Sequence, residues 1–323
     1  MSKPKVVITD YYYESIHQEQ KVMRELGANL MDYHCKTEDE VIAVAADCDA
    51  LICQFAPITR RVIESLTKCK VIVRYAIGVD NIDLKAAEER GIYVCNVPDY
   101  CIDEVSNHVI ALLLDCAKKL TYLSNQVKQG NCSYTVLKPL YRTEGKTLGL
   151  VGFGRIARVI AKKMAGFGLN IITSDPMINE EEVRKLNVTA VTFDELLERS
   201  DYISIHCPLI ASTRHMFDRK AFMKMKDTAV FINTARGGIV NEGDLLWALE
   251  NHVIGMAGLD VTETEPIPMD HPLLKLDNAV VTPHAAWYTE ESIKSLQLKV
   301  AQEVARVLRG ELPKNPVNHP IKT

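Results

Sequence analysis

Short apolar runs rich in β-branched residues alternate with longer amphipathic segments along nearly the whole chain. Apolar runs separated by helical segments are typical of parallel strands that are covered on both faces. The first hundred residues contain five such runs, which we predict to be strands: 5–9, 28–31, 50–53, 71–74 and 92–96. The segments between them have the pattern of helices, at residues 14–26, 38–46, 60–66 and 84–90.

A second series of the same kind begins at Lys146. Pro98 closes the first series, and residues 103–120 form the pattern of a long helix that leads into the second. No low-complexity linker separates the two series, so the boundary between them is one of topology. Two consecutive β-α series predict two doubly wound α/β domains with parallel sheets. The strands of the second series are expected at 147–151, 170–174, 202–206, 228–233, 255–259 and 279–282.

The last periodic segment, residues 290–308, follows the second series and is helical in pattern. It is followed by Gly310 and Pro313, which are typical of a helix end. One terminal helix cannot form a domain by itself. We therefore expect it to pack back on the first domain, which makes that domain discontinuous.

Composition excludes several classes of function. The formal net charge of the 323 residues is −4, which gives no electrostatic footprint for nucleic acid. No stretch approaches the roughly 20 apolar residues of a membrane helix, and the amino terminus lacks the apolar core of a signal peptide. The nine cysteines are scattered, odd in number and without a C-x-x-C pair, and several lie in apolar runs. Reduced, buried thiols in a cytoplasmic protein are the expected interpretation.

A glycine-rich turn opens the second series. An apolar strand leads into Gly152, Gly154 and Ala157 in the pattern G-x-G-x-x-A, and a helical pattern follows. In such a turn the first glycine permits the bend, the second lets the backbone approach a pyrophosphate, and the alanine permits close helix–strand packing. Asp175 follows the next strand about 20 residues later, where a carboxylate accepts hydrogen bonds from an adenosine ribose and repels a 2′-phosphate.

Each of these features also has a purely structural interpretation. The glycines alone are typical of an ordinary tight turn, and Asp175 alone is typical of a turn residue before Pro176. The combination of both features in register favours dinucleotide binding, with NAD ahead of NADP.

Three loops after strands of the second series carry further chemistry. Arg236 stands beside two glycines after the strand at 228–233, and its planar fork suits a carboxylate. Acidic residues crowd the segment 260–265, and His284 follows the strand at 279–282. Taken singly, these residues are typical of a solvated arginine, a solvated acidic loop and a structural histidine.

The predicted sheet brings the carboxyl ends of these strands to one edge, where Arg236, Glu265 and His284 meet. A cation for a carboxylate, a histidine for proton transfer and a carboxylate beside it suit the reduction of a 2-oxo acid. No metal site is expected, because His206, Cys207, Glu265 and His284 are dispersed and lack ligand spacing.

At these residues the chain resembles the D-isomer-specific 2-hydroxyacid dehydrogenase family. The motifs occur in order along nearly the whole length, at 152–157 with Asp175, then at 206–209, 233–240, 258–266 and 282–285. The resemblance implies a Rossmann NAD-binding domain at residues 101–288. It also implies a smaller, discontinuous flavodoxin-like substrate domain at 1–100 and 289–323, with the active site between the two.

The resemblance also implies roles for single residues. Arg236 binds the substrate carboxylate, His284 is the acid/base, and Glu265 pairs with His284 to favour the imidazolium. The cofactor contacts that it implies are Gly152, Gly154, Arg155, Ile156, Asp175, Cys207, Pro208, Thr213, Thr234, Ala235, Arg236, Asp260 and His284. The implied substrate contacts are Arg74, Ile77, Gly78 and Trp287.

The motifs leave three functions within the family open: a dehydrogenase of unphosphorylated 2-hydroxy acids, a phosphoglycerate dehydrogenase and a corepressor-like scaffold. Arg74 matches an arginine of phosphoglycerate dehydrogenases, but Gln54 stands where they commonly carry a second one, which disfavours a phosphorylated substrate. There is also no room after residue 310 for a regulatory domain. The segments 96–98 and 284–288 resemble the C-terminal-binding-protein branch of corepressors, which suggests an NAD-sensing scaffold that binds partner peptides. The length of the chain is near the minimum for the family, which favours an enzyme over such a scaffold.

Two further expectations follow from the resemblance. Residues 103–120 and the segment 121–141, which has apolar and aromatic residues but weak periodicity, are expected at a homodimer interface. Trp287 is expected to form an aromatic wall that suits a medium-sized apolar or thioether side chain of a 2-oxo acid.

Overall fold

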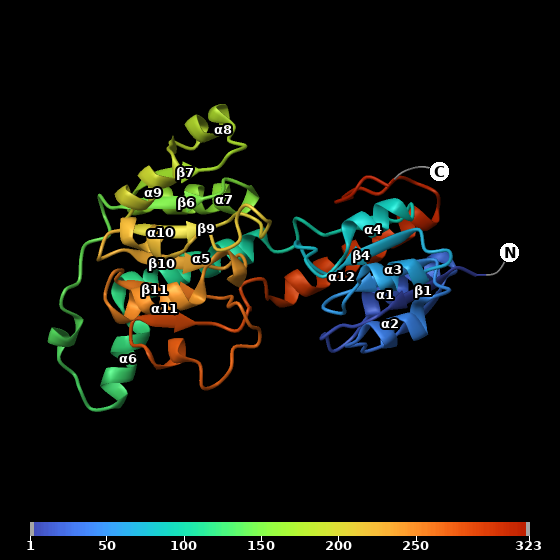
Figure 1. The fold of residues 1–323 in the computed structure, drawn as a ribbon, viewed down its shortest axis with the longest axis horizontal. Helices are drawn as coiled ribbons and strands as arrows, with labels where there is room; N and C mark the ends of the chain where they lie inside the picture. The colour runs from blue at the N-terminus through green and yellow to red at the C-terminus, as the bar shows by residue number, and fades with distance from the viewer. Residues whose placement is uncertain (1–2, 321–323) are drawn as a thin grey trace. The chain divides into compact units, whose positions relative to one another are not determined.

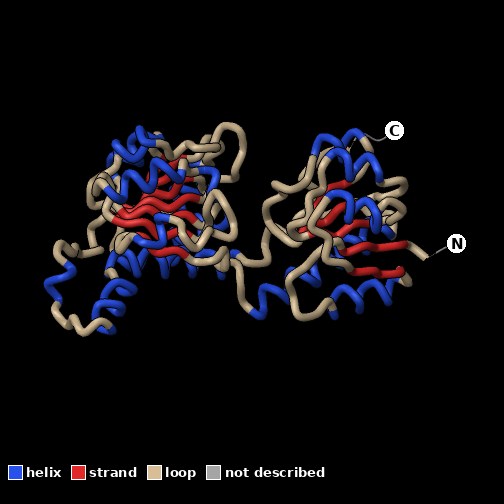
Figure 2. Tube along the Cα trace, turned by 60° about the horizontal axis from the view of Figure 1, so that its bottom comes forward, coloured by secondary structure: helices blue, strands red, loops and turns tan. Residues whose placement is uncertain are grey.

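The computed structural model describes residues 3–320, which divide into two compact units. Unit 1 comprises the residues up to Cys101 together with those from Tyr288 onward, and unit 2 comprises Ile102–Trp287. Both units have a parallel sheet with helices on its two faces (Figures 1 and 2). The predicted doubly wound α/β class is therefore confirmed.

Unit 1 contains a five-stranded parallel sheet in the order β2-β1-β3-β4-β5. Its strands are β1 Lys5–Ile8, β2 Asn29–Asp32, β3 Ala50–Cys53, β4 Val71–Arg74 and β5 Tyr93–Cys95. Its helices are α1 His17–Leu26, α2 Glu38–Ala45, α3 Arg60–Ser65, α4 Leu84–Glu89 and α12 Glu290–Leu308. The central strands are buried along their whole length, as their continuous apolar runs predict.

Helix α12 returns to the first half of the chain and packs against α1 and β4. Thr289 begins it with a capping box, in which the Thr289 and Ser292 side chains each accept a hydrogen bond from the other's backbone N–H. Gln297 on α12 donates a hydrogen bond to the Ser15 carbonyl at 2.6 Å, just before α1. The last helix of the chain is thus an integral part of unit 1.

Unit 2 contains a seven-stranded parallel sheet in the order β12-β11-β10-β9-β6-β7-β8. Its strands are β6 Thr147–Val151, β7 Asn170–Ser174, β8 Thr189–Ala190, β9 Tyr202–Ile205, β10 Val230–Asn233, β11 Met256–Leu259 and β12 Ala279–Val281. The first strand, β6, lies between β7 and β9, so the chain runs outward from it in both directions. Ligands of open α/β sheets bind at such a switch point, outside the carboxyl ends of the strands.

The helices of unit 2 cover both faces of this sheet. The α-helices are α5 Ile102–Lys118, α6 Leu120–Lys128, α7 Arg155–Met164, α8 Glu180–Lys185, α9 Phe193–Arg199, α10 Arg219–Lys224 and α11 Glu242–Glu250. Four short 3-10 helices complete the unit: η1 Tyr134–Leu137, η2 Ala165–Phe167, η3 Gly237–Ile239 and η4 Pro272–Lys275.

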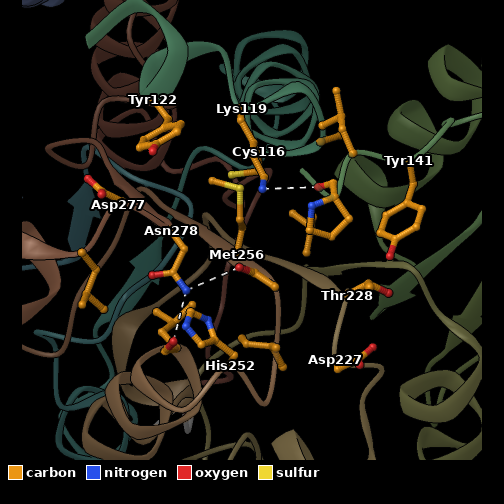
Figure 3. A pocket seen from close by; sticks show the side chains of 18 of the residues that line it. Cys116, Lys119, Tyr122, Tyr141, Asp227, Thr228, His252, Met256, Asp277 and Asn278 are labelled. Atoms are coloured by element: carbon orange, nitrogen blue, oxygen red, sulfur yellow. Dashed lines mark hydrogen bonds between the residues drawn. The ribbon is translucent and has the colours of Figure 1, made fainter. Parts of the chain in front are cut away.

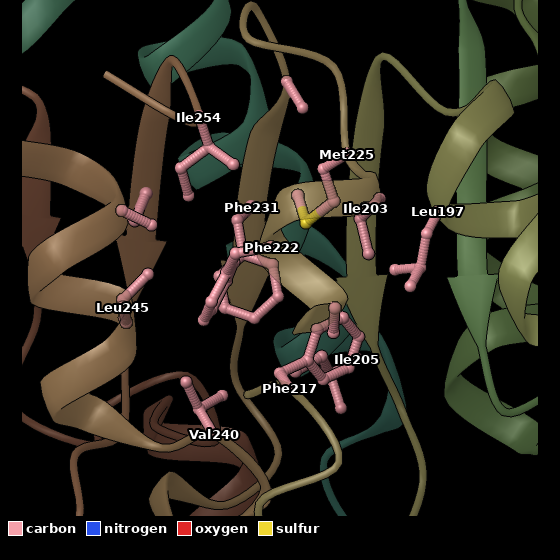
Figure 4. Close-up of a cluster of buried hydrophobic side chains, with 14 of the residues drawn as sticks. Leu197, Ile203, Ile205, Phe217, Phe222, Met225, Phe231, Val240, Leu245 and Ile254 are labelled. Carbon is pink, nitrogen blue, oxygen red and sulfur yellow. The ribbon is translucent and has the colours of Figure 1, made fainter. Parts of the chain in front are cut away.

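A cluster of buried side chains between the sheet and helices α9, α10 and α11 forms the main core of unit 2 (Figure 4). The rings of Phe217 and Phe222 meet the Phe231 ring edge-to-face, with ring centroids 5.0 and 5.5 Å away. Aromatic rings favour such edge-to-face contacts. They fix β10, the strand that leads to Arg236, within the sheet.

Two sequence-based expectations need correction. The helix expected at 103–120 ends at Lys118, because Lys119 adopts a left-handed backbone (φ 53°), and α6 begins at Leu120. The segment 121–141, whose periodicity is weak in the sequence, is therefore partly helical. The edge strand β8 was not expected, because it has only two residues and both are exposed. Within residues 3–320, no helix combines the length with the apolar composition that a bilayer crossing demands.

Candidate active site

The glycine turn after β6 is held tightly against the loop after β9. Gly152 has φ 89°, and a β-carbon placed on it would lie 2.9 Å from the Cys207 nitrogen and from the His206 carbonyl carbon. Both the left-handed backbone and the close approach exclude a larger residue. Glycine at this position is therefore dictated by the fold.

The start of α7 has the features of an anion site. Gly154 is the N-cap of α7 and, as a glycine, supplies no capping side chain. A β-carbon on Gly154 would have no atom within 4 Å, so the space beside it is open. Arg155 and Ile156 form the beginning of the helix, with Arg155 exposed. A helix N-terminus with a glycine N-cap beside open space fits a pyrophosphate.

Asp175 stands just beyond β7, next to this turn. One carboxylate oxygen accepts a hydrogen bond from the Phe153 N–H at 2.7 Å, and the other accepts from the Met177 N–H at 2.7 Å. The side chain therefore does form the turn at Pro176, and it also ties the glycine turn to β7. A carboxylate oxygen has two lone pairs, so acceptor capacity for a ribose remains.

Two polar atoms near the strand ends are buried without a hydrogen-bond partner in the part of the chain that the structure describes. They are Thr234 Oγ1, just after β10, and His206 Nε2, just after β9. Buried polar groups of this kind are rare unless a ligand or water satisfies them. Burial lowers the pKa of His206 to about 3, so its imidazole is neutral. The sequence placed His206 in the 206–209 motif and gave no support for it as a metal ligand, but it did not indicate this orphaned atom.

The loop after β9 is closed by a threonine. Thr213 Oγ1 donates to the Pro208 carbonyl at 2.6 Å and accepts from the Ile210 N–H at 2.9 Å. Burial raises the pKa of Cys207 to about 11, so this residue is a thiol at neutral pH. Its sulfur lies 3.9 Å from Met216 Sδ. Cys207, Pro208 and Thr213 thus form one compact loop beside the glycine turn.

Arg236 follows β10 and is the N-cap residue of the short helix η3. The Asn233 side chain donates to the Arg236 carbonyl and accepts from the Ala235 N–H, both at 3.0 Å. Arg236 Nη1 donates to the Ala235 carbonyl at 2.7 Å. A β-carbon on the next residue, Gly237, would lie 2.0 Å from the Thr262 carbonyl oxygen. The absence of a side chain at Gly237 therefore lets the acidic loop pack directly beside Arg236.

Glu265 and His284 form a hydrogen-bonded pair in this acidic loop and the loop after β12. His284 Nδ1 lies 2.7 Å from Glu265 Oε2, and about a third of each side chain is exposed. Burial alone would raise the pKa of Glu265, but the His284 hydrogen bond, the Thr262 N–H and the charge of Arg236 lower it below its usual 4.5. Glu265 is therefore ionised at neutral pH, with Arg236 close enough to act on its charge.

The backbone of His284 is held in an unusual conformation. Its φ of 53° lies in the left-handed region, which costs about 1–3 kcal/mol for a residue with a side chain. The His284 N–H donates to the Asp260 carbonyl at 2.8 Å. The Asp260 carboxylate, 1% exposed, accepts from the Ala285 N–H at 2.9 Å and the Ala286 N–H at 2.8 Å. Asp260, expected as a cofactor contact, is thus also the anchor of the His284 loop.

Trp287 is fixed to the same loop. Its indole Nε1 donates to the His284 carbonyl at 2.8 Å, and the residue is half-buried. The indole orientation is therefore tied to the turn that carries His284.

The other expected substrate residues belong to unit 1. Arg74 ends β4, where its Nε donates to the Gln54 carbonyl at 3.0 Å and its Nη1 to Asp80 at 3.4 Å. Ile77 and Gly78 lie half-buried in the following loop, and the Asn96 side chain donates to the Ile77 carbonyl at 2.6 Å. Within residues 3–320, no group of three or more histidine, cysteine, aspartate or glutamate side chains is placed to hold a metal ion.

Comparison with known proteins shows which family the chain resembles. A family model described as D-isomer specific 2-hydroxyacid dehydrogenase, NAD binding domain, matches residues 110–286. The glyoxylate reductase of Korarchaeum cryptofilum is 39% identical over 87% of this chain and 86% of its own length. The D-3-phosphoglycerate dehydrogenase of Methanocaldococcus jannaschii is 39% identical over 98% of this chain, which spans 60% of that relative.

A solved structure gives the same result at the level of the fold. The D-lactate dehydrogenase of Aquifex aeolicus, complexed with NAD and lactic acid, superposes with a TM-score of 0.88 at 27% identity. The match covers 98% of this chain and 100% of the other. The family that the motifs indicate is thus confirmed: the chain belongs to the D-isomer-specific 2-hydroxyacid dehydrogenases, which are NAD-dependent enzymes.

Proposed function

We propose that the chain reduces a small 2-oxo acid to the corresponding D-2-hydroxy acid with NADH, using Arg236, Glu265 and His284. The observation that carries this proposal is the 2.7 Å pair of His284 Nδ1 and Glu265 Oε2 beside Arg236. Because Nδ1 is held by the carboxylate, Nε2 is the ring nitrogen left to exchange a proton with substrate.

Each of the three side chains has a distinct task in this proposal. Arg236 binds the substrate carboxylate with its planar fork and thereby orients the keto carbon. His284 Nε2 donates a proton to the carbonyl oxygen, and the ionised Glu265 favours the imidazolium before transfer. In the reverse direction the neutral imidazole takes the hydroxyl proton. When bound, the nicotinamide supplies the hydride.

The residues around the β6–α7 turn are proposed to hold the cofactor. The open space at Gly154 and the glycine-capped N-terminus of α7 fit the pyrophosphate, and Asp175 fits the adenosine ribose. The orphaned Thr234 hydroxyl fits a polar cofactor group that would satisfy it. The remaining proposed contacts are Gly152, Arg155, Ile156, Cys207, Pro208, Thr213, Ala235 and Asp260. Unit 2 is then the NAD-binding domain, and unit 1, with Arg74, Ile77 and Gly78, the substrate domain.

Replacing Asp175 with serine should narrow the preference for NADH over NADPH. The carboxylate repels the 2′-phosphate of NADPH, and serine removes that charge. The measurement is kcat/KM with each cofactor at a fixed 2-oxo acid concentration. Asp175→Asn is the matched control, because its amide oxygen preserves an acceptor for the Phe153 or Met177 N–H while the charge is lost. Equal efficiency of the unmodified protein with both cofactors would contradict the assignment.

We propose a medium-sized apolar 2-oxo acid as the preferred substrate. Trp287 offers an aromatic face beside His284, and sulfur–ring contacts contribute about 0.3–1.5 kcal/mol. A phosphorylated substrate requires several cations, and Gln54 occupies the position where a second arginine would support Arg74. The relatives differ on this point, since one is named a glyoxylate reductase and another a D-3-phosphoglycerate dehydrogenase.

A panel of 2-oxo acids with NADH tests both the reaction and the substrate. We expect a higher kcat/KM for 4-methylthio-2-oxobutyrate than for 3-phosphohydroxypyruvate. Trp287→Ala should raise KM for the larger acid about 2- to 10-fold while changing KM for glyoxylate less. Trp287→Phe keeps the aromatic face but removes the bond to the His284 carbonyl, so it separates packing from loop anchoring. The highest efficiency with 3-phosphohydroxypyruvate would indicate a phosphoglycerate dehydrogenase, and NADH binding without any turnover would indicate a scaffold.

We also propose that the chain forms a homodimer through α5 and the segment 120–141. No residue of α6 is buried, and Val127 and Tyr134 are more than half exposed. Figure 1 shows α6 and the chain after it extending away from the sheet of unit 2. A cavity of about 760 Å³ lies beside this segment (Figure 3). Tyr122 and Tyr141 line it from the segment, and Met256 lines it from the beginning of a strand. Exposed apolar residues around such a cavity are typical of an interface.

The dimer is tested by light scattering at micromolar concentration. The expected mass is twice the 36.2 kDa of one chain. Val127→Glu should shift the mass toward a monomer, because a carboxylate would be buried at the contact. Met269→Glu is the matched control, since Met269 is exposed and lies outside the segment. A monomer mass for the unmodified protein would rule the proposal out.

We propose that the protein is located in the cytoplasm, because its cysteines are not paired in disulfides. All nine lie within the described residues and are free thiols. Burial raises the pKa of Cys53 to about 12, so this thiol is unreactive. Free thiols, seven of them buried, suit a reducing compartment.

A further inference from the structure

His108, on α5, contacts the loop that carries His284. Its Nε2 lies 3.0 Å from Thr282 Oγ1 and 3.5 Å from Asp260 Oδ1. The Thr282 hydroxyl donates to Asp260 Oδ1 at 2.5 Å, so its proton is already committed. His108 Nε2 must therefore be the donor to the Thr282 oxygen. Nothing in the proposed reaction uses His108.

This contact continues directly into the backbone around His284. The Asp260 oxygen that accepts from Thr282 also accepts from the Ala285 N–H. Thr282 and Ala285 flank the residues that form the strained turn, and the Asp260 carbonyl accepts from the His284 N–H between them. A left-handed backbone persists only where its surroundings hold it, and here hydrogen bonds hold it from both sides.

We propose that His108 is a positioning residue, which acts through Thr282 and Asp260 to hold the His284 turn so that Nδ1 meets Glu265. The proposal rests on the proposed role of His284 as acid/base. The donation from His108 orients the Thr282 hydroxyl toward Asp260. The Asp260 carboxylate then keeps the Ala285 and Ala286 N–H groups in place. Helix α5 is thereby coupled to the catalytic turn of the same unit.

The main test is His108→Leu, which keeps the bulk and removes the donor. We expect kcat for 2-oxo acid reduction to fall about tenfold, with the dissociation constant of NADH unchanged, because a slightly misplaced acid/base slows chemistry more than binding. The alkaline limb of the pH profile should move to lower pH, because a looser turn weakens the pairing with Glu265. A purely structural role would reduce the melting temperature without moving the pH limb.

Three further variants sharpen the result. His108→Gln should restore most of kcat, because its amide N–H can donate to Thr282 from a similar position. Thr282→Val should reproduce the loss, and the double variant with His108→Leu should be no worse than either single one. Asn107→Ala is the matched control, since Asn107 is the neighbouring exposed residue on α5 and bonds to Asp103 and Lys163 rather than to the loop.

Hydrogen exchange provides a readout that needs no turnover. In His108→Leu, a peptide covering residues 282–287 should exchange about tenfold faster at the Ala285 and Ala286 amides, whereas Asn107→Ala should leave it unchanged. If the wild type reduces no 2-oxo acid but exchange still rises, the proposed function fails and the anchoring by His108 stands. Unchanged exchange and an unchanged pH limb in a stably folded His108→Leu, or no rescue by His108→Gln, would overturn the inference.

Discussion

Replacement of His284 by alanine is expected to lower kcat for 2-oxo acid reduction by roughly 10²–10⁴-fold, the usual contribution of a positioned acid/base. The imidazole is the group whose Nδ1 is held by Glu265, and no other side chain is proposed to donate the proton. The dissociation constant of NADH, measured by fluorescence titration, should change little. Steady-state kinetics with saturating NADH provide the rate.

The strained backbone at His284 calls for a second variant. His284→Asn removes the acid/base but tolerates the left-handed conformation, since asparagine is enriched there. Both variants should lose activity alike. His252→Asn is the matched control, because His252 is an exposed histidine with a φ of 51° in another loop. A rate within tenfold of wild type for His284→Asn would show that another group donates the proton.

Glu265→Gln refines the same prediction and should be milder than loss of His284. The His284 hydrogen bond lowers the pKa of the Glu265 carboxyl, so a negative charge lies beside the proposed proton donor. Reduction consumes a proton from that donor, and its rate therefore falls as pH rises. Without the carboxylate, the alkaline limb of the rate profile should move to lower pH. A shift of this limb upward would contradict the pairing.

The second large effect is expected at Arg236. Arg236→Lys keeps the charge but removes the planar fork, so the substrate carboxylate loses one of two parallel hydrogen bonds. A hydrogen bond to a charged group contributes about 1.5–3 kcal/mol, which predicts a loss of about 10- to 100-fold in kcat/KM. Most of the loss should appear in KM for the 2-oxo acid.

The controls for Arg236 separate charge from geometry. Arg236→Gln removes both the charge and the planar guanidinium. We therefore expect kcat/KM to decrease in the order wild type, Arg236→Lys, Arg236→Gln. Arg219→Lys is the matched control. Arg219 lies on α10, and its guanidinium carbon is 4.1 Å from the centroid of the Trp247 ring on α11. An unchanged kcat/KM in Arg236→Lys would mean that a different group holds the carboxylate.

The apolar pattern of the sequence is sufficient to predict the two sheets, because strands buried on both faces must be continuously apolar. It fails at β8, whose two exposed residues carry no apolar signal. It also fails at Lys119, where a single residue with a left-handed backbone interrupts the helix expected at 103–120. No glycine or proline in the sequence marks this position. Local backbone choices of this kind depend on packing with the rest of the unit.

By itself, the sequence determines the chemistry available at each strand end: the glycine turn, the arginine between strand and glycines, and the histidine after β12. Only the tertiary structure decides which acidic group serves which partner. Glu263 pairs with His215 at 2.8 Å, Asp260 is buried and holds the backbone after His284, and Glu265 bonds to His284. Spacing cannot distinguish these three carboxylates, because the loop takes its path from its close packing on Gly237, a contact between distant parts of the chain.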